Sequence, residues 1–342
     1  MKRVVAFGNP LLDTTVFIND SYLLNKYNLQ DDGQKEIGLE EMERLSSDIK
    51  SYKEYYTAGG CSQNALRVLQ WLLQKQCEAT IFGSVGHDQE ANILKKLIED
   101  DGVTTRYILQ ENLPTGKTIA LVKELNRSLV AYLGAAENLP LESLLAETEF
   151  HDYLKNADFI YMEGFFLTNR VNAAQYILNL CNQINKIFIF NISGEYLLNI
   201  LPDTVKYFVE NSDVVFGNKR EYEALRNQMG MRSLEELADY IIKNGKNRMK
   251  EYGKIVIITD GANMGKCFYG GDRIHNFVVP LLNTEDIKDT TGAGDAFTGG
   301  FIAGLCSEKS IEECAKIGCY AAHEIIKQTG CSIPRFIPNI LE

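Results

Sequence analysis

Short apolar runs constrain the fold of this chain more than any other feature of its sequence. Several show no alternation with polar residues, which is typical of strands that are covered on both faces. The runs occupy residues 3–7, 79–83, 158–162, 186–191, 213–216 and 255–259. Segments with apolar residues at helical spacing lie between them, at residues 62–74, 89–100 and 233–243. This alternation predicts an α/β fold with a doubly wound, mostly parallel sheet flanked by helices.

Two stretches interrupt this rhythm, at residues 14–58 and 114–133. Apolar residues alternate with other residues in the second stretch, as they do in half-buried strands. We predict that the two stretches form a small β-rich lid, and that residues 1–13, 59–113 and 134–342 form the large nucleotide-binding core. Ligands of open α/β sheets bind at the C-terminal ends of the strands, where a lid can exclude water.

The composition argues against two kinds of partner. The chain has 342 residues and a net charge of −11, and its basic residues are scattered, so we expect no binding to nucleic acid. No stretch approaches a membrane span, and the N-terminal apolar run is too short for a signal peptide. The eight cysteines include no C-x-x-C pair, which favours reduced thiols. We therefore expect a monomer in the cytoplasm, with the nucleus as a further compartment.

A glycine-rich turn with one carboxylate precedes an apolar segment near the C-terminus. The N–H groups of Gly292, Ala293 and Gly294 have little side chain in front of them, so they can bind a phosphate at a helix N-terminus. Asp295 is repelled by a phosphate there, which suits it to act as a base for a hydroxyl that attacks phosphorus. The alternative is an ordinary helix N-terminus. Phe297 stands where a dinucleotide fingerprint needs its third glycine, so that motif is excluded.

Polar side chains also follow the first predicted strand and begin a later predicted helix. Asp13, like Asn9, follows the strand, and a carboxylate accepts the paired hydrogen bonds that ribose hydroxyls donate. Gly59 and Gly60 let the backbone approach a ligand closely, and Asn64 in the first helical turn can reach a sugar hydroxyl. Each of these residues has an alternative interpretation as part of an ordinary turn or helix cap.

Two isolated charges could act on phosphates. Glu221 follows a predicted strand and could hold Mg²⁺ through water, although it also suits a solvated helix start. Arg127 lies in the predicted lid, where it could close over phosphates or simply be exposed. A Gly-Lys-Thr segment ends at Thr118 but has Glu111 where a P-loop needs glycine. A His-Glu pair has Lys327 where the second histidine of a zinc motif belongs.

These motifs together span the chain nearly end to end. They are Gly8-Asn-Pro-Leu-Leu-Asp13, Ala58-Gly-Gly60 with Gln63-Asn64, Gly164-Phe-Phe-Leu-Thr168, Gly217-Asn218-x-x-Glu221 and Asp289-Thr290-x-Gly-Ala-Gly-Asp-Ala-Phe297. The set resembles the ribokinase (pfkB) family of carbohydrate and nucleoside kinases. The resemblance implies a ribokinase-like fold with a β-rich lid, ATP as phosphoryl donor and Mg²⁺ as cofactor. The first and third motifs point to adenosine as the acceptor.

The resemblance also implies a role for each matching position. Asp295 matches the catalytic base, residues 292–294 the anion hole and Arg127 a lid arginine on the phosphates. Asp13 matches the carboxylate on the ribose hydroxyls, and Phe166 is expected to pack on the base. The matches in the acceptor pocket are Asn9, Asp13, Gln34, Gly59, Gly60, Asn64, Leu129, Ala131 and Phe166. The matches on the ATP side are Asn191, Asn218, Glu221, Thr259 and Gly261, with Glu221 also serving the metal.

The reaction implied is attack of the adenosine 5′-hydroxyl on the γ-phosphorus of ATP, which gives AMP and ADP. Cys61 and Thr291 depart from the family pattern, which has Ser or Thr at the first position and Asn at the second. One alternative is a kinase for another nucleoside or a sugar, although Phe166 favours a purine. Another is a catalytically silent protein that binds adenosine or a nucleotide, for which Asp295 beside a phosphate would have no use.

Overall fold

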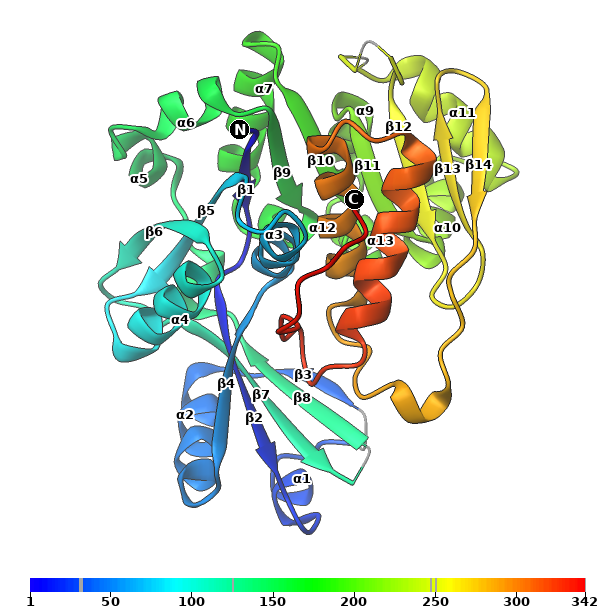
Figure 1. The fold of residues 1–342 in the computed structure, drawn as a ribbon. Coiled ribbons are helices and arrows are strands. Elements are labelled where there is room, and N and C mark those ends of the chain that lie inside the picture. The colour runs from blue at the N-terminus through cyan, green and yellow to red at the C-terminus, as the bar shows by residue number, and fades with distance from the viewer. Residues whose placement is uncertain (31–32, 125, 247, 250, 342) are drawn as a thin grey trace.

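The computed structural model describes residues 1–30, 33–124, 126–246, 248–249 and 251–341. Small parts of the predicted lid and core, at residues 31–32, 125, 247, 250 and 342, lie outside the described residues. Two sheets organise the described chain, a large one with helices on both faces and a small one below it (Figure 1). No helix within the described ranges is long and apolar enough to cross a membrane.

The large sheet has nine strands in the described chain. In spatial order they are β14 (Arg273–Phe277), β13 (Gly265–Tyr269), β12 (Ile255–Thr259), β11 (Val214–Asn218), β10 (Ile187–Asn191), β9 (Phe159–Glu163), β1 (Arg3–Phe7), β5 (Glu78–Gly86) and β6 (Val103–Gln110). Neighbours from β12 to β6 are parallel, and β13 and β14 add an antiparallel edge. The predicted doubly wound, mostly parallel sheet is confirmed.

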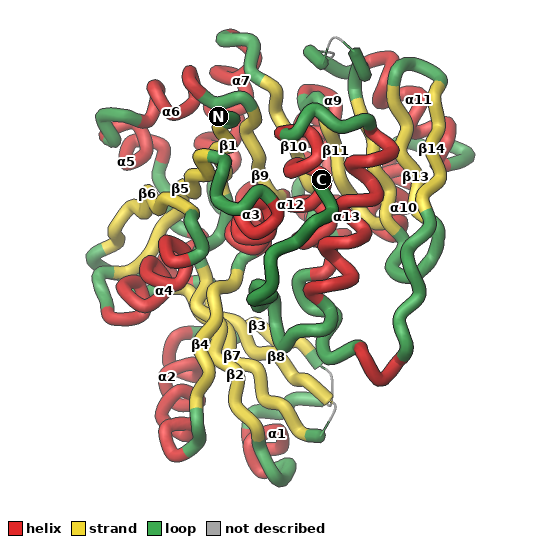
Figure 2. Tube along the Cα trace, in the orientation of Figure 1, coloured by secondary structure: helices red, strands yellow, loops and turns green. Residues whose placement is uncertain are grey.

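Helices cover both faces of this sheet, as Figure 2 shows by colour. The first face packs against α3 (Cys61–Leu72), α4 (Gln89–Asp100), α12 (Ala293–Cys306) and α13 (Ile311–Ile325). The second packs against α5 (Leu141–Ala146), α6 (Phe150–Asn156), α7 (Val171–Gln183), α8 (Glu195–Ile200), α9 (Pro202–Asn211), α10 (Lys219–Gln228) and α11 (Leu234–Asn244). In β1, Val4 and Ala6 face the first layer while Val5 and Phe7 face the second. Both faces are buried, which explains why the runs lack polar alternation.

The small sheet has five strands in the described chain. In spatial order they are β3 (Gln34–Glu36), β8 (Asn126–Tyr132), β7 (Gly116–Lys123), β2 (Leu11–Phe17) and β4 (Glu54–Gly59). Its outer face packs against α1 (Tyr22–Lys26), α2 (Leu39–Asp48) and the 3₁₀ helix η1 (Ile49–Ser51). The sheet begins at Leu11, before the predicted lid, because Leu11 already pairs with β4 and β7.

Three further 3₁₀ helices complete the described elements. They are η2 (Gly134–Glu137), η3 (Gly164–Leu167) and η4 (Thr284–Asp286). The first two connect strands to the helices that follow them, and η3 comes directly after β9. Because η3 follows a parallel strand of the large sheet, it brings Phe165 to the strand ends where ligands bind in such folds.

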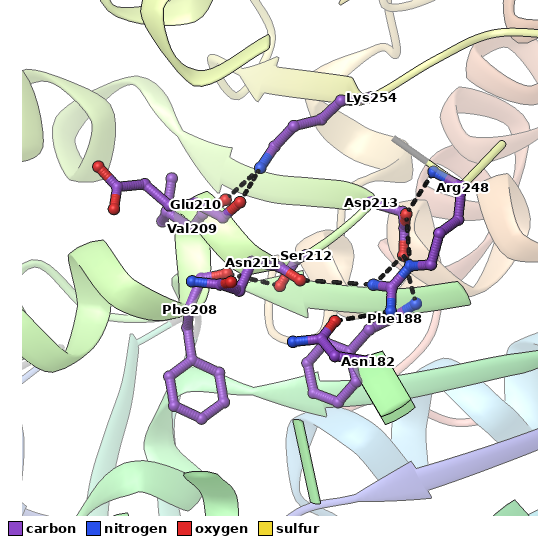
Figure 3. A network of polar contacts seen from close by, with 10 residues as sticks. All are labelled: Asn182, Phe188, Phe208, Val209, Glu210, Asn211, Ser212, Asp213, Arg248 and Lys254. Atoms are coloured by element: carbon purple, nitrogen blue, oxygen red, sulfur yellow. Dashed lines mark hydrogen bonds and ion pairs between the residues drawn. The ribbon is translucent and has the colours of Figure 1, made fainter. Parts of the chain in front are cut away.

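A buried polar network lies at the N-terminal ends of the parallel strands, where β11 and β12 begin (Figure 3). Asp213 accepts hydrogen bonds from the backbone N–H and the Nε of Arg248, at 3.0 and 2.9 Å. Lys254 is 1% exposed and donates to the carbonyl oxygens of Val209 and Glu210, in the last turn of α9. Burial lowers the pKa of Lys254 to about 7. The network thus supplies partners for helix-end carbonyls that would otherwise lack them.

Candidate active site

Two adjoining cavities lie at the C-terminal ends of the parallel strands, where ligands of open α/β sheets bind. The larger measures about 540 Å³ and lies between the small sheet and the large one. The smaller measures about 160 Å³ and adjoins the ends of β10, β11 and β12. Their linings share Cys61, Gly294 and Asp295. Two substrates, one in each cavity, would therefore meet at these shared residues.

The turn that begins α12 forms part of this shared wall. Gly292 caps the helix with φ of +77°, and a Cβ there would overlap the Cys331 side chain, so glycine is required. The N–H of Ala293 makes a long hydrogen bond of 3.3 Å to the carbonyl of Thr290, which closes the turn. The turn presents backbone N–H groups at the positive end of a helix dipole. Such an arrangement is suited to binding a phosphate.

Asp295 lies in the first turn of α12, is 9% exposed and lines both cavities. Its Oδ2 accepts a hydrogen bond of 3.0 Å from Nδ2 of Asn64. Burial raises the pKa of Asp295, while hydrogen bonds from Asn64 and Cys61 oppose the change. A buried carboxylate held in this way beside a phosphate-binding turn can accept the proton of an attacking hydroxyl.

The inner face of the small sheet forms the opposite wall of the larger cavity. Arg127, Leu129 and Ala131 alternate along β8 and line the cavity, and Gln34 pairs with Leu129 from β3. Arg127 Nη1 lies 2.6 Å from Oδ2 of Asp289 in an ion pair. The same nitrogen donates to the Thr291 hydroxyl. Arg127 therefore connects the small sheet to the glycine-rich turn across the cavity mouth.

Asp13 supplies a second carboxylate to the larger cavity. The Thr118 hydroxyl of β7 donates to Asp13 Oδ1 at 2.6 Å, and the two residues are partners in the sheet. A Cβ at Gly59 would overlap this carboxylate, so Gly59 leaves the space that Asp13 occupies. Removal from water raises the pKa of Asp13, and the Thr118 bond and the charge of Arg127 oppose the change. The carboxylate is placed to accept hydrogen bonds from paired hydroxyls.

Two buried charged residues were not predicted as site residues, namely Glu163, which lines the larger cavity, and Arg170, which contacts the lining residue Asn9. Glu163 is fully buried at the end of β9, and its two oxygens accept the N–H groups of Asn9 and Ser62, both at 2.8 Å. Burial raises the pKa of Glu163 to about 7. Arg170 Nη2 donates to Asn9 Oδ1 at 2.6 Å. The signal available in the sequence was that Glu163 directly precedes the Gly-Phe-Phe-Leu-Thr motif.

The aromatic residue of the Gly-Phe-Phe-Leu-Thr motif that lines the cavity is Phe165, whereas the family resemblance implied Phe166. Phe166 is fully buried, with the Arg170 guanidinium 4.4 Å from its ring and the Phe7 ring 5.9 Å away. Both residues belong to η3, and successive side chains of a 3₁₀ helix point about 120° apart. One of them therefore faces the core while the other faces the cavity. Phe165 is stacked with Tyr196 at a centroid distance of 6.1 Å.

The smaller cavity contains the residues predicted for the ATP side. Asn218 and Glu221 form a capping box at α10, in which Asn218 donates through its N–H and its Nδ2 at 2.9 and 2.7 Å. Burial raises the pKa of Glu221 to about 7. The cavity is also lined by Asn191 and Thr259. Both oxygens of Glu221 are thus engaged by Asn218, so the carboxylate is held in a fixed position.

The smaller cavity offers few side chains that could bind a metal ion directly. Within the described ranges, no group of three or more His, Cys, Asp or Glu side chains could hold one directly. The carboxylates in the lining of the smaller cavity are Glu221 and Asp295. Mg²⁺ keeps several of its waters and takes one or two carboxylates together with phosphate oxygens. These residues fit Mg²⁺ held through water and phosphate, and they do not form a protein cage.

Most of the predicted site residues converge on the two cavities. The larger is lined by the predicted Asn9, Asp13, Gln34, Gly60, Asn64, Arg127, Leu129, Ala131, Gly292, Ala293, Gly294 and Asp295. The smaller is lined by Asn191, Asn218, Glu221 and Thr259, and again by Gly294 and Asp295. Gly59, Phe166 and Gly261 are outside both described linings. Residues that were not predicted also contribute to the larger cavity, among them Cys61, Thr118, Glu163, Phe165 and Tyr196.

Comparison with known proteins identifies the family. The profile of pfkB family carbohydrate kinases matches residues 37–338. Adenosine kinase 2 of Arabidopsis thaliana is 33% identical, over 97% of this chain and 95% of its own length. The crystal structure of Anopheles gambiae adenosine kinase in complex with P1,P4-di(adenosine-5) tetraphosphate is 34% identical, with a TM-score of 0.83 and coverage of 97% and 98%. Schistosoma mansoni adenosine kinase in complex with adenosine and AMP is 30% identical, with a TM-score of 0.81 and coverage of 97% of each chain. The chain therefore belongs to the pfkB carbohydrate kinase family.

Proposed function

We propose that this protein is an adenosine kinase, which transfers the γ-phosphoryl group of ATP to the 5′-hydroxyl of adenosine and gives AMP and ADP. One observation carries the proposal: Asp295 lies in the wall that the two cavities share, at a helix N-terminus that can bind phosphate. The similar proteins support adenosine as acceptor, since the Schistosoma structure is a complex with adenosine and AMP. Purine salvage is the process that such a reaction serves.

In the proposed complex, adenosine occupies the larger cavity. Asp13 accepts hydrogen bonds from the paired ribose hydroxyls, and Asn64 lies between the sugar and Asp295. Phe165, Leu129 and Ala131 offer apolar surface to the base. An aromatic ring and two apolar side chains suit a purine better than a bare sugar.

The reaction in this arrangement is a single in-line transfer. Asp295 accepts the proton of the 5′-hydroxyl as its oxygen forms a bond to the γ-phosphorus, and the bond from that phosphorus to the β-γ bridging oxygen of ATP breaks. Nucleophile deprotonation is late in a loose transition state, so Asp295 acts mainly by orienting the hydroxyl. The N–H groups of Gly292, Ala293 and Gly294 stabilise the charge on the transferring oxygens.

ATP occupies the smaller cavity and its open side in this proposal. Asn191, Asn218 and Thr259 face the nucleotide, and Glu221 would hold Mg²⁺ through water. When bound, Mg²⁺ neutralises charge on the β- and γ-phosphate oxygens. The capping box with Asn218 keeps the Glu221 carboxylate in one orientation for that purpose.

We also propose that residues 14–58 and 114–133 act as a lid over the core formed by residues 1–13, 59–113 and 134–342. Arg127 bridges to Asp289 in this structure, so it would exchange that partner for phosphate when ATP binds. We also propose that the protein is a monomer. We place the protein in the cytoplasm, with the nucleus as a second compartment.

A panel of acceptors tests the proposed function. The purified protein is incubated with ATP, Mg²⁺ and either adenosine, guanosine, a pyrimidine nucleoside or ribose, and the monophosphate product is measured by chromatography. We expect AMP from adenosine with a kcat/KM at least about tenfold above that for any other acceptor, since apolar contacts with the base discriminate by about 1–3 kcal/mol. Preferential phosphorylation of ribose, or no phosphorylation of any acceptor, would overturn the proposal.

A further inference from the structure

Arg67 is a buried cation directly behind the proposed active site. It lies on α3, one turn after Asn64, and is 5% exposed. It is absent from the described linings of both cavities, so it is not placed to touch a substrate. A buried guanidinium is costly unless its donors are engaged, which makes its partners informative.

The partners of Arg67 come from four separate segments. Its Nη1 donates to the carbonyl oxygens of Ala58 and Cys331, at 3.1 and 3.0 Å, and to Oδ1 of Asn64 at 3.3 Å. Two hydrogens on this nitrogen are thus shared among three oxygens. Its Nε donates to Asp101 at 2.6 Å on the outer side. One side chain thereby joins the end of β4, the start of α3 and the C-terminal segment.

The contact with Asn64 defines the orientation of that amide. Asn64 accepts from Arg67 through Oδ1 and donates to Asp295 through Nδ2. The reversed amide would place its NH₂ group against a guanidinium and its oxygen against a carboxylate, and both contacts are repulsive. The amide is therefore anchored at one end by a cation and donates from the other end to the proposed base.

The remaining contacts fix two walls of the site relative to Asn64. Ala58 precedes Gly59, which makes space for Asp13, while Cys331 packs against Gly292 in the phosphate-binding turn. The positive charge of Arg67 also favours the ionised form of Asp13, because it opposes the rise in pKa that burial causes. Loss of the contact with Oδ1 would free the Asn64 amide to turn away from Asp295.

We infer that Arg67 is a positioning residue for phosphoryl transfer, which holds the Asn64 amide so that it orients Asp295. The inference rests on the proposed adenosine kinase activity. Arg67→Lys keeps the positive charge but loses the planar set of donors that reaches several oxygens. We expect kcat to fall by about 10- to 100-fold, because small misplacements of a catalytic group have effects of this size. The KM for ATP should change by less than about twofold, since ATP binds on the far side of Asp295.

A double-mutant cycle tests this inference. We compare kcat for the wild type, Arg67→Lys, Asn64→Ala and the double variant, with circular dichroism and the melting temperature as checks on folding. If Arg67 acts through Asn64, adding Arg67→Lys to Asn64→Ala lowers kcat by less than about twofold. A loss in the double variant equal to the product of the two single losses would overturn the inference. If the wild type itself forms no AMP, the proposed function fails instead.

Two further variants separate positioning from general stability. Asp101→Asn removes the charge that Arg67 meets on its outer side and leaves the contact with Asn64 intact, so we expect kcat within about twofold of the wild type. A loss in Asp101→Asn as large as that in Arg67→Lys would contradict the inference. Arg67→Gln replaces Arg67→Lys in the same double-mutant cycle if Arg67→Lys does not fold. The inference again predicts that it lowers kcat by less than about twofold in the Asn64→Ala background.

Discussion

Buried charged groups lie at both ends of the parallel strands in the large sheet, which are called here the C-terminal edge and the N-terminal edge. The groups at these two edges have different surroundings. At the C-terminal edge, Glu163 lines the larger cavity, and burial raises its pKa to about 7. At the N-terminal edge, Lys254 contacts backbone carbonyls, and burial lowers its pKa to about 7. The perturbed pKa is therefore no guide to function by itself. The difference lies in whether the group faces space that a ligand can fill.

The partners of the carboxylates show the same contrast. Asp213 accepts two backbone N–H groups and pairs with Arg248 at 2.5 Å. Asp295 accepts hydrogen bonds from Asn64 and from the Cys61 thiol and otherwise faces the two cavities. The oxygens of Asp213 are engaged within the protein, whereas those of Asp295 can still accept a hydrogen bond from a ligand in either cavity. Substitutions at the N-terminal edge should therefore lower stability, whereas substitutions at the C-terminal edge should lower catalytic activity.

The largest effect is expected at the C-terminal edge. Asp295→Asn keeps the size and one acceptor of the side chain but removes the base, so kcat should fall by about 10²- to 10⁴-fold. The dissociation constant for adenosine, measured by calorimetry, should change by less than about tenfold, because Asp13 and Phe165 remain. Turnover near the wild-type rate would remove Asp295 from its proposed role.

A large effect on stability is expected at the N-terminal edge. Asp213→Ala leaves the buried Arg248 guanidinium without its carboxylate, so the free energy of unfolding should fall by about 3–5 kcal/mol. The kcat of the folded variant at low temperature should stay close to the wild type. Denaturant unfolding and initial rates measure the two quantities. Asp239→Ala, which breaks an exposed pair with Lys243, is the control and should change stability little.

A pH-dependent effect is expected at Lys254. Its pKa is about 7 when folded and about 10.5 when unfolded, so the unfolded chain binds more protons between these values. Stability should therefore rise with pH above 7, relative to Lys254→Met, by up to about 1.4 kcal/mol per pH unit. Below pH 7 the difference between the two proteins should be constant. Urea unfolding from pH 6 to 8.5 provides the test, and a difference that is flat above pH 7 would contradict it.

The smallest effect is expected from Glu163→Gln. An amide NH₂ would then face the N–H of Asn9 or Ser62, so one wall of the larger cavity should shift. We expect the KM for adenosine to rise by about tenfold, which corresponds to one lost hydrogen bond near 1.4 kcal/mol. Glu149→Gln, at an exposed ion pair with Arg106, serves as control. An unchanged KM in Glu163→Gln would show that the carboxylate has no part in shaping the cavity.

The fold was predictable because its signal is local. Apolar runs without alternation identify strands that are buried on both faces, and each predicted run coincides with a strand of the large sheet. The place of the glycine-rich turn in the cavity wall was predictable for a similar reason, because its glycines and Asp295 are adjacent in sequence. Leu129 and Ala131 were expected from the family resemblance, and the alternation in β8 explains why both line the same cavity, since every second residue lies on the same face.

The errors and omissions have physical causes as well. The family resemblance implied Phe166, but in the 3₁₀ helix η3 it faces the core while Phe165 faces the cavity, a direction that the motif alone does not give. The bond between Glu163 and Ser62 joins residues far apart in sequence, so no local pattern marks it. The contacts of Asp213 with Arg248 and of Lys254 with α9 are likewise non-local. Sequence patterns therefore identified the glycine-rich turn of the proposed site more readily than the residues that support it.

A crystal structure with adenosine and a non-hydrolysable ATP analogue tests the central claim most directly. The proposal predicts that the adenosine 5′-oxygen lies within about 3.2 Å of an Asp295 carboxylate oxygen, with the γ-phosphate at the N-terminus of α12. It also predicts that Asp13 binds the ribose hydroxyls and that Phe165 contacts the base. A 5′-oxygen that points away from Asp295, with the γ-phosphate outside the turn at Gly292, would contradict it.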